Sequence, residues 1–315
     1  MFVFRFSWAV LVLLLVSVWA EELTEEENAV VEDKSEEVSV SQLLNMFVFR
    51  FSWAVLVLLL VSVWAEELTK EETSVELSEG LPVSVLLERA NRNRVPDLGG
   101  PILVEGDIAV DSEAERNADP CTSRGCMWGK FTDGKVYVPY YISNQYSSRE
   151  RSIIERGLES FSSVSCIRFR PYRNSDRDYL SIEPRSGCSS YVGRRGGGQT
   201  VSLDRQGCLY HGTVQHELLH ALGFNHEQTR SDRDKHIRIY WENILDSYKF
   251  AYDKIATLNQ GTPYDYNSVM QYHRYAFSKN NKPTMVPIPN GNLAFGEATE
   301  MSRNDIIRLT SLYKC

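Results

Sequence analysis

The residues most suited to chemistry lie in one short run, HGTVQHELLHALGFNHEQTRSDRD, at 211–234. On a helix, His216 and His220 would lie four residues apart and project from one face, so both imidazoles can reach one metal ion. Gly223 can take the left-handed conformation that ends a helix, and the chain can then turn back to present His226 as a third ligand. The spacing therefore predicts a metal site with three histidines.

Glu217 follows the first of these histidines and is placed to act as a base rather than as a ligand. Three neutral nitrogen ligands leave one zinc position for water, which is typical of a catalytic site. Glu217 would take a proton from that water and pass it to the departing amine during peptide-bond hydrolysis. The alternative, a helix with surface histidines, is disfavoured because the extended H-E-x-x-H-x-x-G-x-x-H spacing is specific. His211, His236 and His273 lack this spacing and are expected to be surface or packing residues.

The elements that would position this motif can be predicted from residue patterns. The expected strands are 135–142, 166–172, 178–184 and 199–205. The expected helices are 149–163, a segment from near Gly212 to near Gly223, and 302–315, with Ser147 or Ser148 capping the first and Ser302 or Asn304 the last. Few long periodic segments lie between the second and third helices. This order predicts an α+β fold that ends in an irregular second lobe.

Charge divides the 315-residue chain into two parts. Residues 1–116 hold 8 Lys and Arg against 22 Asp and Glu, a net charge of −14, whereas residues 117–315 hold 26 against 20, a net charge of +6. All six cysteines and all six histidines lie in the second part. The division predicts an acidic leader before a folded domain of roughly 200 residues. On charge alone, a solvated acidic tail is an equal alternative.

The N-terminus begins MFVFRFSWAVLVLLLVSVWAEE, and its apolar run is shorter than the ~20 residues of a usual membrane span. It predicts a secretory signal peptide at 1–20. The first 24 residues recur at 46–69, which indicates a tandem duplication of the leader rather than a stacking repeat, with Met46 as an alternative start. If translation begins at Met1, the second copy could instead act as a membrane anchor.

Six cysteines behind a secretory leader predict disulfides, because the exported compartment is oxidising. Spacing alone does not select among the fifteen possible pairings. Cys121 and Cys126 are near enough to close a small loop, and Cys315 would tie down the C-terminus. A zinc–cysteine site is the weaker alternative, because no C-x-x-C pair is present.

Residues 70–116 are acidic and interrupted by Gly and Pro, so we expect them to be mostly irregular, with Arg116 as a processing site. The glycine-rich run RRGGG at 194–198 has neither P-loop nor Rossmann spacing, so it is expected to be a flexible loop between strands.

Together, HELLHALGFNHEQTRSDRD and YDYNSVMQYHRYAFS (264–278) closely resemble the astacin family of metzincin metalloproteases. The resemblance covers most of 117–315 and looks closest to the six-cysteine, fish-type members: hatching (choriolytic) enzymes, nephrosin and patristacin. It implies a two-lobed protease with a twisted mixed sheet, an active-site helix and one Zn²⁺ ion. In that family the S-x-M-x-Y segment forms a turn, so Met270 would pack beneath the metal. Tyr272 would bind zinc in the resting enzyme and swing to stabilise the tetrahedral intermediate.

The same resemblance implies a latent precursor. LVEGDIAV (103–110) looks like the family's propeptide segment, in which an aspartate, here Asp107, displaces the nucleophilic water. A trypsin-like protease would cleave after Arg116, and the new amino terminus at Asn117 would pair with Glu227. The chain would then comprise a signal peptide at 1–20 with a near-identical copy at 46–65, an acidic, inhibitory propeptide region at 21–116 and a protease domain at 117–315.

Family disulfides imply Cys166 with Cys315 and Cys188 with Cys208, which leaves Cys121 with Cys126. Gln271 and His273 depart from the family pattern, which usually has His and often Gly there, and this bears on substrate preference.

The expected protein is a monomeric extracellular endopeptidase acting on proteins of the egg-envelope or matrix type. Storage in secretory granules is a further possibility, and no nucleic-acid partner is expected. The alternative, a non-catalytic secreted binding module with the same fold, requires a lost ligand or base, and none is lost.

Overall fold

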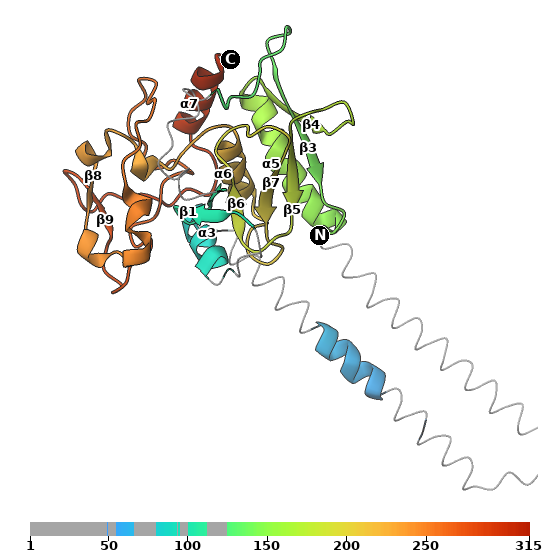
Figure 1. Ribbon diagram of the computed structural model, residues 1–315. Coiled ribbons are helices and arrows are strands. Elements are labelled where there is room, and N and C mark those ends of the chain that lie inside the picture. Colours follow the sequence, from blue (N-terminus) through green and yellow to red (C-terminus); the bar gives the residue numbers. More distant parts are fainter. Residues whose placement is uncertain (1–48, 50–54, 66–79, 93, 95–99, 112–124) are drawn as a thin grey trace, which may run out of the picture. The chain divides into compact units, whose positions relative to one another are not determined.

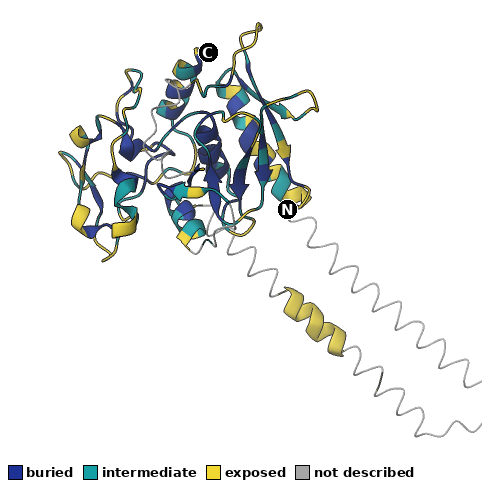
Figure 2. Ribbon diagram, viewed as in Figure 1, coloured by how far each residue is buried: buried dark blue, intermediate teal, exposed yellow. Residues whose placement is uncertain are grey.

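The computed structural model describes residues 49, 55–65, 80–92, 94, 100–111 and 125–315. The chain divides into two compact units, Met1–Glu72 and Thr73–Cys315. In the first unit, residues 55–65 form a helix that is exposed along its whole length (Figure 2). Among the described residues, no helix is both long and apolar enough to cross a membrane. The signal peptide, Met46, Arg116 and Asn117 lie outside the described residues.

A seven-stranded mixed sheet forms the centre of the second unit, in the order β1-β2-β6-β7-β5-β3-β4 (Figure 1). Its strands are β1 (Ile102–Val104), β2 (Ile108–Val110), β3 (Val136–Ile142), β4 (Ile167–Pro171), β5 (Tyr179–Glu183), β6 (Cys188–Ser190) and β7 (Gly198–Leu203). The β3–β4, β3–β5, β5–β7 and β2–β6 pairs are parallel, and the β1–β2 and β6–β7 pairs are antiparallel. All four predicted strands are confirmed to within two residues, whereas the short strand β6 was missed.

Two helices, α5 (Ser148–Val164) and α6 (His211–Ala221), pack against each other and against the sheet. The Ser147 side chain accepts a hydrogen bond from the Glu150 N–H, and the Glu150 carboxylate accepts one from the Ser147 N–H, so a capping box begins α5. The predicted apolar stripe of α5 is buried. Gly157 permits a close helix crossing, because a Cβ there would lie 2.4 Å from Val214 Cγ1.

The C-terminal lobe has little regular structure, as predicted. It contains the two-stranded sheet of β8 (Ile237–Ile239) and β9 (Met285–Pro287) and four 3₁₀ helices. The terminal helix α7 (Arg303–Tyr313), which Ser302 caps, follows this lobe, and its buried Leu309 and Tyr313 belong to the core of the sheet lobe. The 3₁₀ helices are η2 (Glu227–Thr229), η3 (Arg233–Lys235), η4 (Trp241–Asn243) and η5 (Asp246–Tyr252). Figure 1 shows β8 and β9, in orange, on the opposite side of α6 from β3, β4 and β5. The two lobes have separate apolar cores, so the two-lobed α+β prediction is confirmed.

The prediction of an irregular acidic leader is wrong for its described part. Residues Val83–Arg92 form the helix α3, and β1 and β2 extend the main sheet. Val83, Leu86 and Leu87 fall at i, i+3 and i+4 and are buried on one face of α3. The surrounding acidic and Gly/Pro-rich residues hid this short periodicity.

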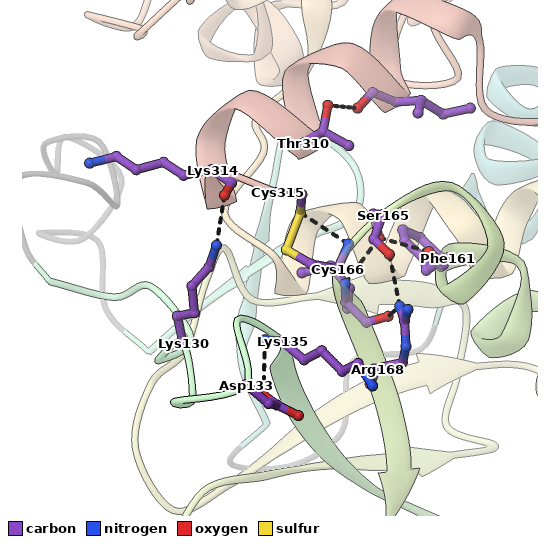
Figure 3. The surroundings of a disulfide bond; sticks show 12 residues. Lys130, Asp133, Lys135, Phe161, Ser165, Cys166, Arg168, Thr310, Lys314 and Cys315 are labelled. Carbon is purple, nitrogen blue, oxygen red and sulfur yellow. Dashed lines mark hydrogen bonds between the residues drawn. A yellow bond between two sulfur atoms is a disulfide. The ribbon is translucent and has the colours of Figure 1, made fainter.

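Two disulfides join distant segments of the second unit. Cys188 bonds to Cys208, and Cys166 bonds to Cys315. Around the latter, the Lys130 ammonium donates to the Lys314 carbonyl at 2.7 Å, so the C-terminus is fixed to the sheet lobe (Figure 3). Cys126 is also disulfide-bonded, but Cys121, its expected partner, lies outside the described residues.

Candidate metal centre

The helix α6 brings the first two motif histidines together in the protein interior. His216 and His220 are both at most 1% exposed, and their Nε2 atoms lie 3.0 Å apart. Gly223 follows with φ +103°, and this left-handed residue turns the chain so that His226 faces the same point. The ring centroids of His216 and His226 lie 5.3 Å apart, and those of His220 and His226 4.7 Å apart.

Hydrogen bonds to the outer ring nitrogens hold all three imidazoles in place. His216 Nδ1 lies 2.9 Å from the Val269 carbonyl, and His220 Nδ1 lies 2.7 Å from the Phe224 carbonyl. A carbonyl only accepts, so each Nδ1 carries the proton and each Nε2 keeps its lone pair for a metal. His226 Nδ1 lies 2.8 Å from Glu105 Oε2.

Asp107 completes the cluster from the N-terminal side of the chain. One carboxylate oxygen lies 3.2 Å from His216 Nε2, and the other lies 3.2 Å from His226 Nε2 and 3.8 Å from His220 Nε2. Burial opposes ionisation of Asp107, but the charge of His226 favours it, and the pKa of this carboxyl falls below its usual range. The same carboxylate, working against burial, raises the pKa of His226 to about 9.

The donor set fits a zinc ion. The four ligand atoms lie within 4.8 Å of one another and all four residues are buried. Ligand atoms of a tetrahedral zinc with Zn–N bonds of about 2.0–2.1 Å lie about 3.3 Å apart, close to the 3.0–3.8 Å spacings found here. His226 Nε2 and Asp107 Oδ1 also have no hydrogen-bond partner among the described residues, which is the condition expected of atoms that bind metal.

Glu217 lies beside the histidines without a partner of its own. Its side chain is fully buried, and neither carboxylate oxygen is hydrogen-bonded to any described residue. Burial first, and then the nearby charge of Asp107, raise the pKa of Glu217 well above its ordinary value. A carboxyl group with this basicity can both accept and return a proton.

Tyr272 and Met270 lie on the chain segment that passes the cluster. The Tyr272 ring centroid is 4.4 Å from that of His226, and burial followed by the charge of Asp107 raises the pKa of its phenol well above the ordinary value. The phenol therefore stays protonated and can donate a hydrogen bond. Met270 is buried, and its carbonyl accepts from the Glu227 N–H at 2.9 Å.

Glu227 is fully buried and already paired. One carboxylate oxygen accepts from Arg230 Nη1 at 3.0 Å and from the Asp265 N–H at 2.8 Å, and the other accepts from Arg308 Nη1. Its expected partner, the amine of Asn117, lies outside the described residues. Any such pairing would add a cation to a carboxylate that two guanidinium groups already contact.

The remaining histidines lie away from the cluster, as expected. His211 is half-buried at the start of α6, and His236 stacks on Tyr264 with 4.9 Å between centroids. His273 Nε2 lies 2.6 Å from Glu88 on α3. His273 does not take a positive φ, so its side chain causes no left-handed strain where the family often has glycine.

The contacts that the N-terminal segment makes around the cluster were not predicted from the sequence. Glu105 reaches His226, and the Asn91 amide donates to the carbonyls of Gly106 at 3.0 Å and Cys188 at 2.8 Å. The only available signal was the position of Glu105 two residues before Asp107, which does not by itself indicate a histidine partner.

Comparisons with known proteins agree with this geometry. The family model described as Astacin, a peptidase family, matches residues 128–314. The low choriolytic enzyme of Oryzias latipes is 47% identical over 240 residues, which cover 76% of this chain and 86% of that enzyme. High choriolytic enzyme 1 of the same fish is 46% identical over 215 residues, which cover 68% of this chain and 78% of that enzyme. A solved structure of high choriolytic enzyme 1, described as a hatching enzyme zinc-protease, matches at 47% identity with a TM-score of 0.60, covering 63% of this chain and 100% of that chain.

Proposed function

Because the chain belongs to the astacin family of zinc metalloendopeptidases, we propose that it is secreted as an inactive precursor whose own leader blocks the metal centre. The observation that carries the proposal is the place of Asp107, within 3.2–3.8 Å of all three histidine Nε2 atoms. A carboxylate there takes the position that water needs for catalysis. Disulfides among the described cysteines support an oxidising, extracellular destination.

After the leader leaves, His216, His220 and His226 hold the zinc ion. Bound zinc would make a water molecule acidic and polarise the carbonyl of a peptide substrate. Glu217 would accept a proton from the attacking water and return it to the departing amine, since its carboxylate lies buried beside the histidines with no other hydrogen-bond partner among the described residues. Tyr272 remains protonated and donates a hydrogen bond to the oxygen on which negative charge develops.

Activation would follow cleavage after Arg116 by a trypsin-like protease. The new amine of Asn117 would then approach Glu227, a buried carboxylate that Arg230 and Arg308 already contact. The choriolytic names of the relatives support substrates among extracellular proteins of the egg-envelope or matrix type.

The catalytic role of Glu217 is tested with Glu217→Gln in the activated domain. We expect hydrolysis of a quenched fluorescent protein substrate to fall by at least about 10²–10⁴-fold, the usual contribution of a general base. Zinc content and the circular dichroism spectrum should be unchanged. Full activity in this variant, or in parent enzyme treated with a chelator, would rule out the zinc mechanism. A folded, zinc-loaded parent without activity would favour a non-catalytic binding module.

Latency is tested with Asp107→Ala in the uncleaved precursor. We expect substrate hydrolysis before any processing, because no carboxylate then occupies the site of the water. The matched control is Asp111→Asn, which removes an exposed acid four residues away that binds Tyr191 and Arg195. Its latency should equal that of the parent, and equal latency in both variants would reject the role of Asp107.

A further inference from the structure

The three histidines of the metal centre differ in where their outer nitrogen finds a partner. His216 and His220 each bind a backbone carbonyl from the protease part of the chain, at Val269 and Phe224. For His226 Nδ1, the only partner among the described residues is the Glu105 carboxylate, at 2.8 Å. The third histidine thus depends on the leader for the contact that orients its ring.

Glu105 is held for this contact by its surroundings. It is 8% exposed and has φ +52°, a left-handed conformation that costs a non-glycine residue free energy. Hydrogen bonds to the next two residues fix this turn, from the Asn91 amide to the Gly106 carbonyl at 3.0 Å and from the Ser190 N–H to the Asp107 carbonyl at 3.0 Å. The turn therefore places two carboxylates against the metal centre. Asp107 lies near the Nε2 atoms of the three histidines, and Glu105 lies near Nδ1 of His226.

We propose that Glu105 is a positioning residue that strengthens zinc binding by His226, so that the leader retains the metal in the precursor as well as blocking it. The inference rests on the proposed precursor, but it concerns His226 Nδ1 and the affinity for zinc rather than the Nε2 atoms and latency. The consequence is that activation removes an oriented carboxylate from one of the three ligands that stay behind.

The physical basis is the effect of a carboxylate on a metal-binding imidazole. A carboxylate that accepts the Nδ1 proton fixes the tautomer and the ring orientation and makes Nε2 a stronger donor. A carbonyl partner does the same less strongly, because it carries no full charge. The contacts of His216 and His220 survive loss of the leader, whereas that of His226 does not.

The test compares zinc affinity in uncleaved precursors that carry Glu105→Ala, Glu105→Gln or no change. We expect the zinc dissociation constant of Glu105→Ala, measured by competition with a chromogenic chelator, to rise about 10–100-fold, the usual effect of losing such a partner. Glu105→Gln keeps an acceptor oxygen without the charge and should give a smaller rise. In Co²⁺-substituted precursors, the visible absorption bands should shift with Glu105→Ala, because they report the ligand field at the histidines.

The matched control is Glu88→Gln, which removes another leader carboxylate, bonded to His273 rather than to a motif histidine. Its zinc affinity and Co²⁺ spectrum should equal those of the parent. Unchanged affinity in Glu105→Ala, or an equal loss in Glu88→Gln, would overturn the inference. Failure of the proposed protease function would be visible separately, because after cleavage at Arg116 the Glu105 variants and the parent release the same mature domain.

Discussion

The sheet lobe and the C-terminal lobe differ in what fills their interiors. In the sheet lobe, the fully buried positions are mostly aliphatic, as at Val138, Leu180 and Ile182. In the C-terminal lobe, Arg230 is also fully buried, although it carries a full charge. Its guanidinium donates to the carboxylates of Glu227 and Asp232 and to the carbonyls at 262 and 263.

This difference explains why one lobe is regular and the other is not. Alternating or helical apolar patterns favour strands and helices, whose backbone groups satisfy one another. The C-terminal lobe has an apolar core as well, but its buried guanidinium groups pair with free backbone carbonyls, so its backbone can be irregular. Arg233 does this too, by donating to the carbonyls of Gln228 and Tyr252 at 2.8 Å each.

The largest expected effect comes from removing the buried cation of the C-terminal lobe. Arg230→Ala leaves Asp232 and the carbonyls at 262 and 263 without this donor and removes one of the two guanidinium groups that contact Glu227. We expect it to lower the free energy of unfolding by about 3–5 kcal/mol. Urea denaturation of the Glu217→Gln precursor at fixed zinc concentration would measure this without self-cleavage. The control, Arg238→Ala, removes an exposed arginine of β8 and should change stability by less than about 0.5 kcal/mol. Equal effects would mean that the apolar core of this lobe, and not its buried charges, stabilises it.

A truncation in the sheet lobe is expected to have a similar or somewhat smaller effect. Ile182 is fully buried and pairs with Ile142 and Val201 on the neighbouring strands. Ile182→Ala should cost about 2–5 kcal/mol and Ile182→Val about 0.5–1.5 kcal/mol, by the same denaturation measurement. A larger loss for Ile182→Ala than for Ile182→Val would show that the buried side-chain volume determines stability at this position. If both variants cost the same, the site would tolerate cavities, and the proposed contrast between the lobes would fail.

The sheet lobe could be predicted from sequence because its signals are local. Ser147 and Glu150 form a capping box three residues apart, and Ile154 and Leu158 share one helical face, so α5 was predicted to within one residue at each end. By contrast, β6 has only three residues, Cys188–Ser190, and pairs with segments on both sides of it in sequence. A strand of that length has no periodicity to detect.

The candidate site shows the same limit. His216, His220 and the turn at Gly223 lie within one short segment, so their spacing alone predicted that the imidazoles would converge. The contacts of Glu105 with His226 and of Glu227 with Arg308 join residues 121 and 81 positions apart. Such pairs depend on the completed fold. The place of Asp107 was expected only from the family resemblance, because no spacing rule relates it to the histidines.

The smallest expected effect concerns a charge pair near the surface of the sheet lobe. Arg170 donates to both carboxylate oxygens of Asp176, at 2.6 and 2.7 Å, and this hydrogen bonding lowers the pKa of Asp176 to about 2. Because the pKa is lower in the folded state, the stabilisation is complete above the unfolded value of about 3.9 and is lost as the pH falls towards 2. Arg170→Gln should therefore cost at most about 1 kcal/mol, the usual limit for such pairs, equally at pH 7 and pH 5. Denaturation at pH 3 completes the test, since the cost should be smaller there than at pH 7. An equal cost at pH 3 and pH 7 would mean that Asp176 keeps its ordinary pKa in the folded state.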